Sequence, residues 1–279
     1  MKILLLGSKG MLGYEFSKTL KSSKEDYMGL DIEDLDLTNE EKLYDEIGKI
    51  KPKYILNCAA YTDVDKAEFE SEKAFILNGL IPKYLADVSI NINACLIHFS
   101  SDFIFNGKSR VPYAEDNEQN PINAYGKSKL EGDKNIIKSL QKYFIIRTAW
   151  LYGKNGKNFV DTIIALSKTK KILKIVDDQI GSPTYAKDLA CAVLKLIETD
   201  KYGIYNITNQ GQCSRFEWVK EIIKIYNIKI DLINAKSSEF KVPALRPSYS
   251  VLSNNKYNML NLGIMRNWKI ALKDYLIGS

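Results

Sequence analysis

The sequence predicts an α/β fold in which a doubly wound parallel sheet is followed by a small C-terminal lobe. Short apolar runs rich in Ile, Leu and Val alternate with longer segments of helical periodicity. Strands that are apolar throughout and separated by helices are typical of a parallel sheet whose two faces are both covered. The first apolar run leads directly into a glycine loop and a helix, and the alternation ends near residue 210. These observations indicate the fold class and the place where the lobe begins.

The alternation also predicts the individual elements. Strands are expected, in chain order, at residues 2–6, 27–30, 54–58, 95–100, 144–148, 173–176 and 204–207. Helices are expected between them at residues 12–20, 40–50, 70–88, 124–140, 159–168 and 186–199, and later at 216–226 and 269–277. We therefore expect residues 1–209 to form the sheet domain and residues 210–279 to form the lobe. The segment 150–172 is expected to belong partly to the lobe.

The composition excludes several classes of protein. The 279 residues carry a formal net charge of +6, but the lysines are scattered among acids and form no basic stripe, so we expect no nucleic-acid partner. No apolar run approaches the roughly 20 residues of a membrane span, and the short apolar start runs straight into the glycine loop. We therefore expect neither a membrane span nor a signal peptide. The four cysteines are far apart in the sequence and form no metal-binding pair, which favours a reducing cytoplasm.

A phosphate-binding loop is predicted after the first strand. Gly7, Gly10 and Gly13 have the spacing G-x-x-G-x-x-G and lead into a helix. The first glycine permits a tight turn, the second lets the backbone approach a pyrophosphate, and the third lets helix and strand pack closely. The loop predicts a Rossmann fold that binds a dinucleotide. We therefore predict that residues 1–209 form an NAD(P)-binding domain. We assign the three glycines, with Met11 and Leu12, to the cofactor site.

The preferred nicotinamide is left open by two charged residues. Asp31 ends the second predicted strand, where a carboxylate can accept a hydrogen bond from the adenosine ribose and would repel a 2′-phosphate, which favours NADH. Lys9, inside the glycine loop, would attract that phosphate and favours NADPH. Asp36 is assigned to the adenine end of the site. The predicted cofactor is therefore NADPH or NADH.

A tyrosine and a lysine predict the chemistry. Tyr125 and Lys129 are four residues apart on a predicted helix, so both side chains project from the same face. A nearby cation favours a phenolate and lowers a tyrosine pKa from its usual value of roughly 10, which suits general acid–base catalysis. A hydroxyl of the pair Ser100–Ser101 could hold a carbonyl at the same place. The set predicts transfer of a hydride and a proton, whereas His98, the only histidine, stands in a predicted strand and is expected to be structural.

With these motifs the chain resembles the extended short-chain dehydrogenase/reductase superfamily and, within it, the dTDP-4-dehydrorhamnose reductases. The resemblance covers nearly the whole chain, and its last two segments are more specific than the superfamily motifs. It is carried by Asn57-Cys58-Ala59-Ala60-Tyr61-Thr62, Val64-Asp65-Lys66-Ala67-Glu68, Ser101-Asp102-Phe103-Ile104-Phe105, Tyr125-Gly126-Lys127-Ser128-Lys129, Arg147-Thr148-Ala149-Trp150-Leu151-Tyr152, Asp178-Gln179-Ile180-Gly181-Ser182-Pro183-Thr184, and Arg246-Pro247 with Ser250 and Leu252.

The resemblance implies reduction of the C4 keto group of dTDP-4-dehydro-L-rhamnose by NAD(P)H to give dTDP-L-rhamnose. Tyr125 would protonate the C4 oxygen, and Lys129 would hold the nicotinamide ribose and lower the tyrosine pKa. Ser101, which stands where this family usually has threonine, would bind the carbonyl. Further cofactor contacts are implied for Ala59, Ala60 and Asn78. Substrate contacts are implied for Thr62, Val64, Ser101, Asp102, Tyr125, Trp150 and Arg246, the last facing the diphosphate.

Other functions stay open at this point. One is a reductase or 4-epimerase of another nucleotide 4-keto deoxysugar. Another is a non-catalytic, nucleotide-binding regulatory subunit resembling that of methionine adenosyltransferase. Dehydratases of this superfamily have a glutamate where Phe103 stands, which argues against dehydration. Some relatives dimerise through glutamates that bind Mg²⁺. Glu15 matches one such ligand, but Lys187 stands where an acid is implied, so we expect no metal site, and a monomer and a homodimer both stay open.

Overall fold

Within residues 3–278, which a computed structural model of the protein describes, six parallel strands form the central sheet. They are β1 (Ile3–Leu6), β2 (Tyr27–Leu30), β3 (Tyr54–Asn57), β4 (Cys95–Ser101), β5 (Tyr143–Thr148) and β10 (Gly203–Asn206). Their order across the sheet is β2-β1-β3-β4-β5-β10, and every neighbouring pair is parallel. The predicted parallel sheet is confirmed. Lys2, at which the first predicted strand begins, lies outside the described residues.

The central strands are apolar because both of their faces are covered. All four residues of β1 and all seven of β4 are buried. From β1 the chain passes to β2 on one side and later to β3 on the other, so strand order switches between β1 and β3. Ligands of such sheets bind beyond the carboxyl ends of the strands at this switch.

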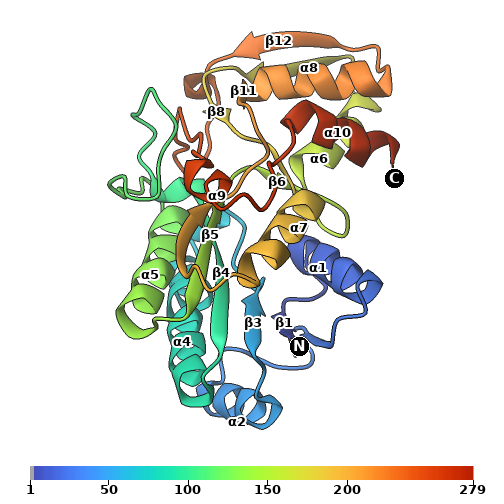
Figure 1. Ribbon diagram of the computed structural model, residues 1–279. Coiled ribbons are helices and arrows are strands. Elements are labelled where there is room, and N and C mark those ends of the chain that lie inside the picture. The colour runs from blue at the N-terminus through green and yellow to red at the C-terminus, as the bar shows by residue number, and fades with distance from the viewer. Residues whose placement is uncertain (1–2, 279) are drawn as a thin grey trace.

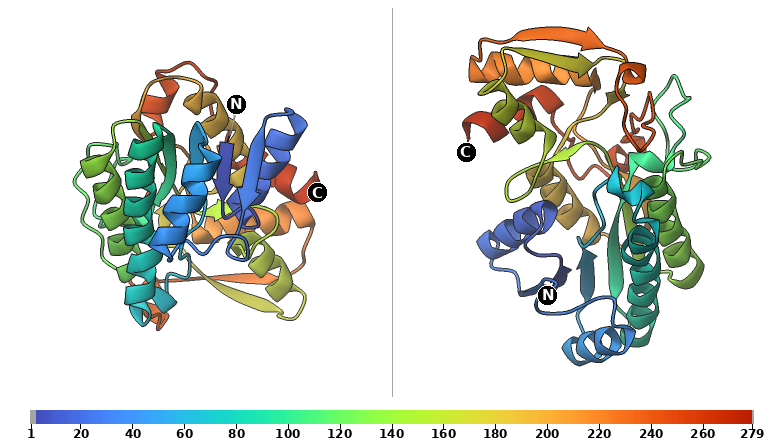
Figure 2. Two further views of the ribbon diagram at one scale, coloured as in Figure 1. Left: turned by 90° about the horizontal axis from the view of Figure 1, so that it is seen from below. Right: turned by 180° about the vertical axis from the view of Figure 1, so that it is seen from behind.

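Helices cover the two faces of the sheet, as Figures 1 and 2 show. On one face α1 (Met11–Ser22) and α7 (Ala186–Ile197) pack against Ile3 and Leu5. On the other face α2 (Glu40–Ile50), α4 (Ile81–Ile92) and α5 (Ala124–Ser139) pack against Leu4 and Leu6. Alternate residues of β1 thus enter two separate apolar cores, as the period of a strand requires.

The helix predicted at residues 70–88 is interrupted in the structure. It consists of α3 (Ser71–Phe75), a five-residue π-helical turn η2 (Ile76–Leu80), and α4. Pro82 stands in the first turn of α4 and has no N–H to donate to the carbonyl of Asn78, so the ordinary helical hydrogen bond cannot form there. The Asn78 carbonyl instead lies against Gly132 of α5, where a Cβ would collide with it.

A second core forms the lobe at the top of Figure 1. It lies among α6 (Phe159–Ser167), α8 (Arg215–Tyr226), α10 (Trp268–Ile277) and the parallel pair β7 (Ile172–Val176) and β12 (Asp231–Ala235). β7 was predicted as a strand but does not join the central sheet. Leu173 and Ile175 are buried while Ile172 and Lys174 are exposed, because only one face of this pair is covered.

The lobe draws on two stretches of sequence. Its core includes Tyr152, from the segment expected to belong partly to the lobe. It also includes Leu173, Ile175 and Tyr185, which lie in the stretch expected to belong to the sheet domain. The chain then returns to the sheet domain in α7 and β10. The remaining short elements are β6 (Leu151–Tyr152), β8 (Ile180–Gly181), β9 (Thr184–Tyr185), β11 (Cys213–Ser214), α9 (Asn255–Asn258), η1 (Lys66–Glu68), η3 (Asp102–Ile104) and η4 (Ser237–Glu239).

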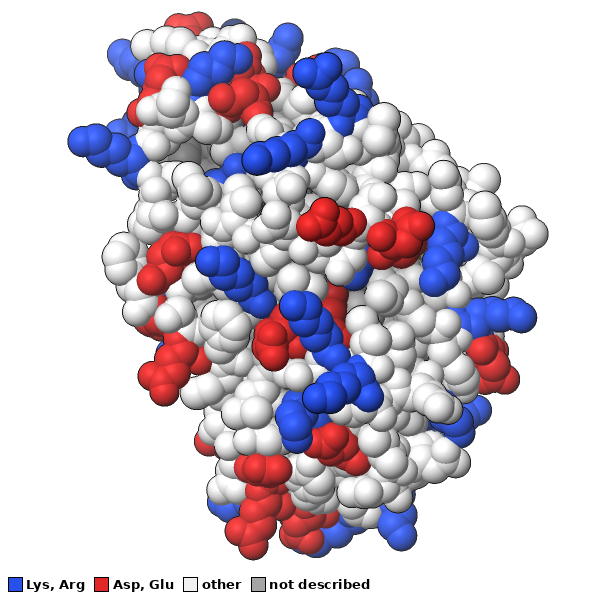
Figure 3. Space-filling model, turned by 90° about the vertical axis from the view of Figure 1, so that its left-hand side faces the viewer, with Lys and Arg blue, Asp and Glu red and all other residues white. Residues whose placement is uncertain are grey.

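Charges of both signs are mixed on the surface. On the face seen in Figure 3, lysines and arginines alternate with aspartates and glutamates over both parts of the molecule. None of the helices in residues 3–278 is long and apolar enough to cross a membrane.

Candidate active site

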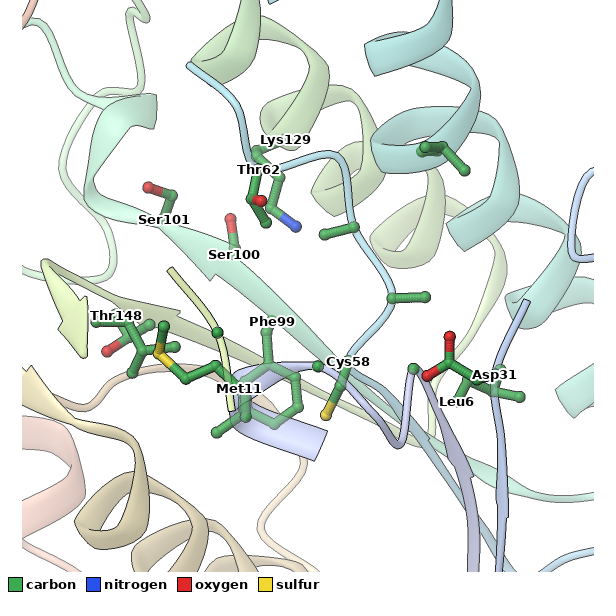
Figure 4. A pocket seen from close by; sticks show the side chains of 18 of the residues that line it. Leu6, Met11, Asp31, Cys58, Thr62, Phe99, Ser100, Ser101, Lys129 and Thr148 are labelled. Carbon is green, nitrogen blue, oxygen red and sulfur yellow. The ribbon is translucent and has the colours of Figure 1, made fainter. Parts of the chain in front are cut away.

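A cavity of about 740 Å³ opens at the carboxyl ends of the parallel strands. Its wall includes a residue at or just after the end of each of five strands, namely Leu6, Leu30, Cys58, Ser101 and Thr148. Figure 4 shows Asp31 at one end of this cavity and Ser100, Ser101 and Lys129 at the other. The cavity therefore extends across the switch in strand order, from the predicted ribose-binding acid to the predicted catalytic residues.

The glycine loop packs closely against the neighbouring backbone and borders the cavity. Gly7 has a positive φ of 72°, and a Cβ there would lie 2.7 Å from the backbone nitrogen of Ala59. At Gly13 a Cβ would collide with the carbonyl of Gly7, so α1 can approach β1 only without a side chain there. Gly10 is the residue just before α1 and lines the cavity, and the start of the helix holds neither an acidic residue nor a side-chain cap. These amides suit an anionic group.

Asp31 is held rigidly at the adenosine end. Its carboxylate accepts hydrogen bonds from the backbone nitrogens of Lys9 at 2.8 Å and Ile32 at 2.9 Å. The Lys9 ammonium forms an exposed ion pair with Glu33 at 3.0 Å. Asp36 also lines the cavity, and hydrogen bonds from the backbone and hydroxyl of Thr38 lower its pKa.

Ser101 and Tyr125 meet at the opposite end of the cavity. The Ser101 hydroxyl donates to the Asp102 carboxylate at 3.1 Å, accepts from the backbone nitrogen of Phe103 at 3.2 Å, and is a hydrogen-bond partner of the Tyr125 phenol. The Tyr125 ring contacts Phe103 edge to face, with 5.7 Å between centroids. Asn123 caps the start of α5 by accepting from the backbone nitrogen of Gly126 at 2.7 Å. The tyrosine is therefore fixed by a helix cap, a ring contact and a hydrogen bond.

The pKa of Tyr125 corrects one expectation. We expected Lys129 to lower it, but burial and the carboxylates of Asp102 and Asp133 raise it to about 12, and only the bond with Ser101 acts in the other direction. Burial lowers the pKa of Lys129 to about 8, although the Asp133 carboxylate works against that change. Since the phenol keeps its proton at neutral pH, Tyr125 is suited to donate a proton.

A layer of buried charge lies behind these residues. Asp133 follows Lys129 by one helical turn, is fully buried, and accepts a hydrogen bond from Ser100 at 3.0 Å. The Arg147 guanidinium, also buried, lies 3.5 Å from the same carboxylate and donates to the Glu115 carbonyl at 2.8 Å. Sequence reasoning did not single out Asp133, although the repeat of Tyr125, Lys129 and Asp133 at every fourth position could have revealed a shared face.

The whole chain matches known proteins. The protein-family model described as the RmlD substrate binding domain matches residues 1–278 of this chain. The spore coat polysaccharide biosynthesis protein SpsK of Bacillus subtilis is 38% identical over 276 residues, which cover 99% of this chain and 96% of SpsK. A crystal structure of a dTDP-4-dehydrorhamnose reductase from Clostridium acetobutylicum is 42% identical, with a TM-score of 0.96 and 99% of each chain covered. The enzyme of that name from Bacillus anthracis, solved with NADP, is 37% identical, with a TM-score of 0.97, and covers 100% of this chain and 99% of its own.

The chain belongs to the dTDP-4-dehydrorhamnose reductase family. Most of the site residues expected from the sequence lie together in this family member. Those that line the cavity are Gly7, Gly10, Met11, Leu12, Asp31, Asp36, Ala59, Ala60, Thr62, Ser101, Asp102, Tyr125, Lys129 and Trp150.

Four expected residues do not line the cavity of this family member. Gly13 and Asn78 lie behind it, and the Asn78 amide is bonded to both backbone groups of Tyr61 and to the Ser128 hydroxyl, each at 3.0 Å. Val64 and Arg246 do not line it either. The Arg246 guanidinium is bound instead to the Asp65 carboxylate, at 2.8 and 2.6 Å. Asn78 therefore shapes the loop that follows β3, and Arg246 joins the lobe to the sheet domain.

The family member also has cavity residues that sequence reasoning missed. Asn155, Gly156 and Lys157 come from the loop between β6 and α6. The Asn155 amide donates to the Lys9 carbonyl at 2.6 Å, which ties this loop to the glycine loop. The signal for it was a G-x-N-G pattern, which predicts a turn but not its partner. Among residues 3–278 no group of three or more His, Cys, Asp or Glu side chains could hold a metal ion.

Proposed function

We propose that this protein reduces the C4 keto group of dTDP-4-dehydro-L-rhamnose with NADPH or NADH to give dTDP-L-rhamnose. The observation that carries the proposal is the set Ser101, Tyr125 and Lys129, which faces one cavity with the glycine loop in a chain that matches this reductase family over residues 1–278. The four free cysteines suit a cytoplasmic location.

The cavity fits a nicotinamide dinucleotide. Side chains at Gly7 and Gly13 would collide with backbone, and the uncapped start of α1 offers N–H groups to a pyrophosphate. Asp31 would hold the adenosine ribose, and Lys129 would hold the nicotinamide ribose at the other end. When bound, the reduced nicotinamide supplies a hydride to C4 of the sugar.

The remaining chemistry belongs to the protein. The Ser101 hydroxyl binds the C4 oxygen and orients the carbonyl toward Tyr125. As C4 gains the hydride, the electron pair of the C=O bond moves to oxygen, and the Tyr125 phenol gives its proton to that oxygen. The tyrosinate that remains is stabilised by the Lys129 ammonium and regains a proton from solvent. A resting pKa of about 12 keeps Tyr125 protonated and ready to act as the acid.

The decisive experiment supplies dTDP-4-dehydro-L-rhamnose with NADPH and, separately, with NADH. With at least one of the two cofactors, we expect the absorbance of the reduced nicotinamide to fall. One molecule of dTDP-L-rhamnose should form for each molecule of cofactor oxidised. Absence of turnover with both, in protein that still binds a dinucleotide, would contradict the proposal and favour the regulatory-subunit alternative. Turnover of a different nucleotide 4-keto sugar alone would keep the reductase and reject the substrate.

A further inference from the structure

An arginine that the sequence did not single out lies beside the substrate end of the cavity. Arg215 is the first residue of α8 and is half-buried. Its guanidinium carbon lies 3.5 Å from the ring centroid of Trp150, 4.8 Å from that of Phe159 and 5.5 Å from that of Trp218. Aromatic rings that stack on a guanidinium hold its plane in one orientation while its N–H groups stay free.

The ring on which Arg215 stacks is itself tightly held. Trp150 lines the cavity and has a positive φ of 46°, a conformation uncommon outside glycine that is often found at functional sites. Gly181 of β8 lies against the indole, where a Cβ would collide with it. The indole plane stacks on Trp218 with 5.6 Å between centroids. The platform under Arg215 is therefore rigid.

The guanidinium of Arg215 has no acceptor within residues 3–278. Its backbone nitrogen donates to the Gln179 carbonyl at 3.2 Å, but its side chain forms neither a hydrogen bond nor an ion pair with a described residue. Burial lowers its pKa to about 10, so it is charged at neutral pH. Asp102 is close enough to favour the charged form, and Arg246 is close enough to oppose it. A guanidinium has five N–H donors in a planar fork, which matches the oxygens of a phosphate.

Arg246, which was expected to face the diphosphate, is already satisfied. Both of its terminal nitrogens donate to the Asp65 carboxylate, at 2.8 and 2.6 Å, and one also donates to the Ala244 carbonyl at 2.6 Å. The start of α8 is satisfied as well. The Ser214 hydroxyl accepts from the backbone nitrogen of Glu217 at 3.1 Å, and the Glu217 carboxylate accepts from that of Ser214 at 2.8 Å. The Arg215 side chain, by contrast, donates no hydrogen bond to any of residues 3–278.

We propose that Arg215 binds the diphosphate of the nucleotide-sugar substrate. The inference rests on the proposed function for the identity of that anion, and on the aromatic stacking and free donors for the residue. The diphosphate would lie on the side of Trp150 that Arg215 occupies, which leaves the sugar toward Ser101 and Tyr125. Arg246 would act by holding the lobe against Asp65.

The test compares the binding of dTDP and thymidine to four proteins by isothermal titration calorimetry. These are the wild type, Arg215→Gln, Arg215→Lys, and Lys220→Gln, which removes a charge from an exposed position of the same helix. Loss of a hydrogen-bonded charge should weaken dTDP binding to Arg215→Gln by on the order of 10- to 100-fold and leave thymidine binding unchanged. Arg215→Lys should fall between, because an ammonium keeps the charge but loses the fork. Lys220→Gln should match the wild type.

Two results would overturn the inference. The first is unchanged dTDP affinity in Arg215→Gln, even if the pH dependence of activity moves, since that outcome would make Arg215 a partner of Asp102 only. The second is an equal loss of dTDP and thymidine binding, which would show a general disturbance of the site. The proposed function can fail separately. A wild type that binds dTDP through Arg215 but does not oxidise NADPH or NADH with the 4-keto sugar would retain this inference and reject the reductase.

Discussion

The two ends of the cavity are formed by different kinds of segments of the chain. At the cofactor end the wall is formed by the glycine loop and by residues at or after the ends of β1, β2 and β3. At the substrate end it depends on side chains of distant segments, such as Trp150 and Arg215, which stack on each other across 65 positions of sequence. The first end is specified by local turn and strand geometry, and the second by packing of the lobe core. Changes at the first end should therefore act on folding and cofactor together, whereas changes at the second should act on the substrate.

The proposed catalytic residues lie at the substrate end but belong to elements of the sheet domain. Tyr125 and Lys129 belong to α5, which packs on the sheet, while Ser101 is followed by η3 and the buried Asp102. Asp133 and Arg147 place charge behind them in the sheet domain. The proposed proton donor is thus held by the sheet domain, whereas the proposed diphosphate site at Arg215 belongs to the lobe.

The largest effect is expected at the proposed proton donor. Tyr125→Phe removes the proton donor and keeps the ring contact with Phe103, so kcat should fall by about 10²- to 10⁴-fold while the Kd of NADPH stays the same. Steady-state kinetics and a cofactor titration measure both quantities. Tyr226→Phe, on an exposed ring of α8, is the matched control. Near-normal turnover in Tyr125→Phe would remove Tyr125 from the mechanism.

The next effect sharpens the contrast at the cofactor end. In Gly13→Ala the added methyl would collide with the Gly7 carbonyl, which should cost about 1–3 kcal/mol of unfolding free energy and weaken NADPH binding. Gly48→Ala, in α2, meets no atom within 4 Å and should raise stability by roughly 0.5–1 kcal/mol. Urea unfolding and a cofactor titration test the pair. Equal stability of the two variants would show that the contact between loop and helix does not matter.

A smaller effect concerns pH. The Lys129 ammonium, whose pKa is about 8 instead of 10.5, should be lost as pH rises through about 8, so kcat/KM should fall there. The Asp133 carboxylate raises that pKa, and Asp133→Asn should move this fall in kcat/KM to lower pH. In the window from about 8 to 10.5 the unfolded chain holds a proton that the folded protein has lost, so this group makes stability rise with pH.

The pH profile of kcat/KM tests this expectation, with melting temperatures to confirm that the variants fold. Glu131→Gln removes an acid from an exposed position of the same helix and should leave the profile in place. A profile that does not move in Asp133→Asn would contradict the role assigned to this carboxylate.

The smallest effect is expected where the lobe meets the sheet domain. Asp65→Asn weakens a part-exposed ion pair with Arg246 and should cost about 1 kcal/mol or less. The KM for the nucleotide sugar should change less than it does in Arg215→Gln. Thermal unfolding and steady-state kinetics measure both, with Asp63→Asn as the neighbouring control. If KM rose more in Asp65→Asn than in Arg215→Gln, the diphosphate would have to be assigned to Arg246 instead of Arg215.

Most of the sheet domain could be predicted because its signals are local. The strand at residues 27–30 and the helix at 40–50 have the predicted limits, since periodicity and a capping asparagine mark them within a few residues. The spacing of Tyr125 and Lys129 likewise follows from one turn of helix. The direction of the Tyr125 pKa could not be predicted, because burial and the acids around it depend on tertiary structure.

The substrate end could not be derived in the same way. The stretch 172–176 has an ordinary strand pattern, and nothing within it shows that its partner is β12 instead of the central sheet. Arg246 and Asp65 are 181 positions apart in the sequence. Arg215 is one of many basic residues in the sequence, and only its stacking on Trp150 in the folded protein distinguishes it. Such contacts are set by how the lobe packs, which no short motif encodes.

The most direct test of the account follows the hydride itself. The protein is incubated with dTDP-4-dehydro-L-rhamnose and with NADPH in which both hydrogens on C4 of the nicotinamide ring are replaced by deuterium. The product sugar is analysed by mass spectrometry and NMR. We expect one deuterium per product molecule, bound to C4 of the sugar. Product without deuterium at C4, or deuterium at another carbon, would contradict hydride delivery across the gap between the cofactor and Tyr125.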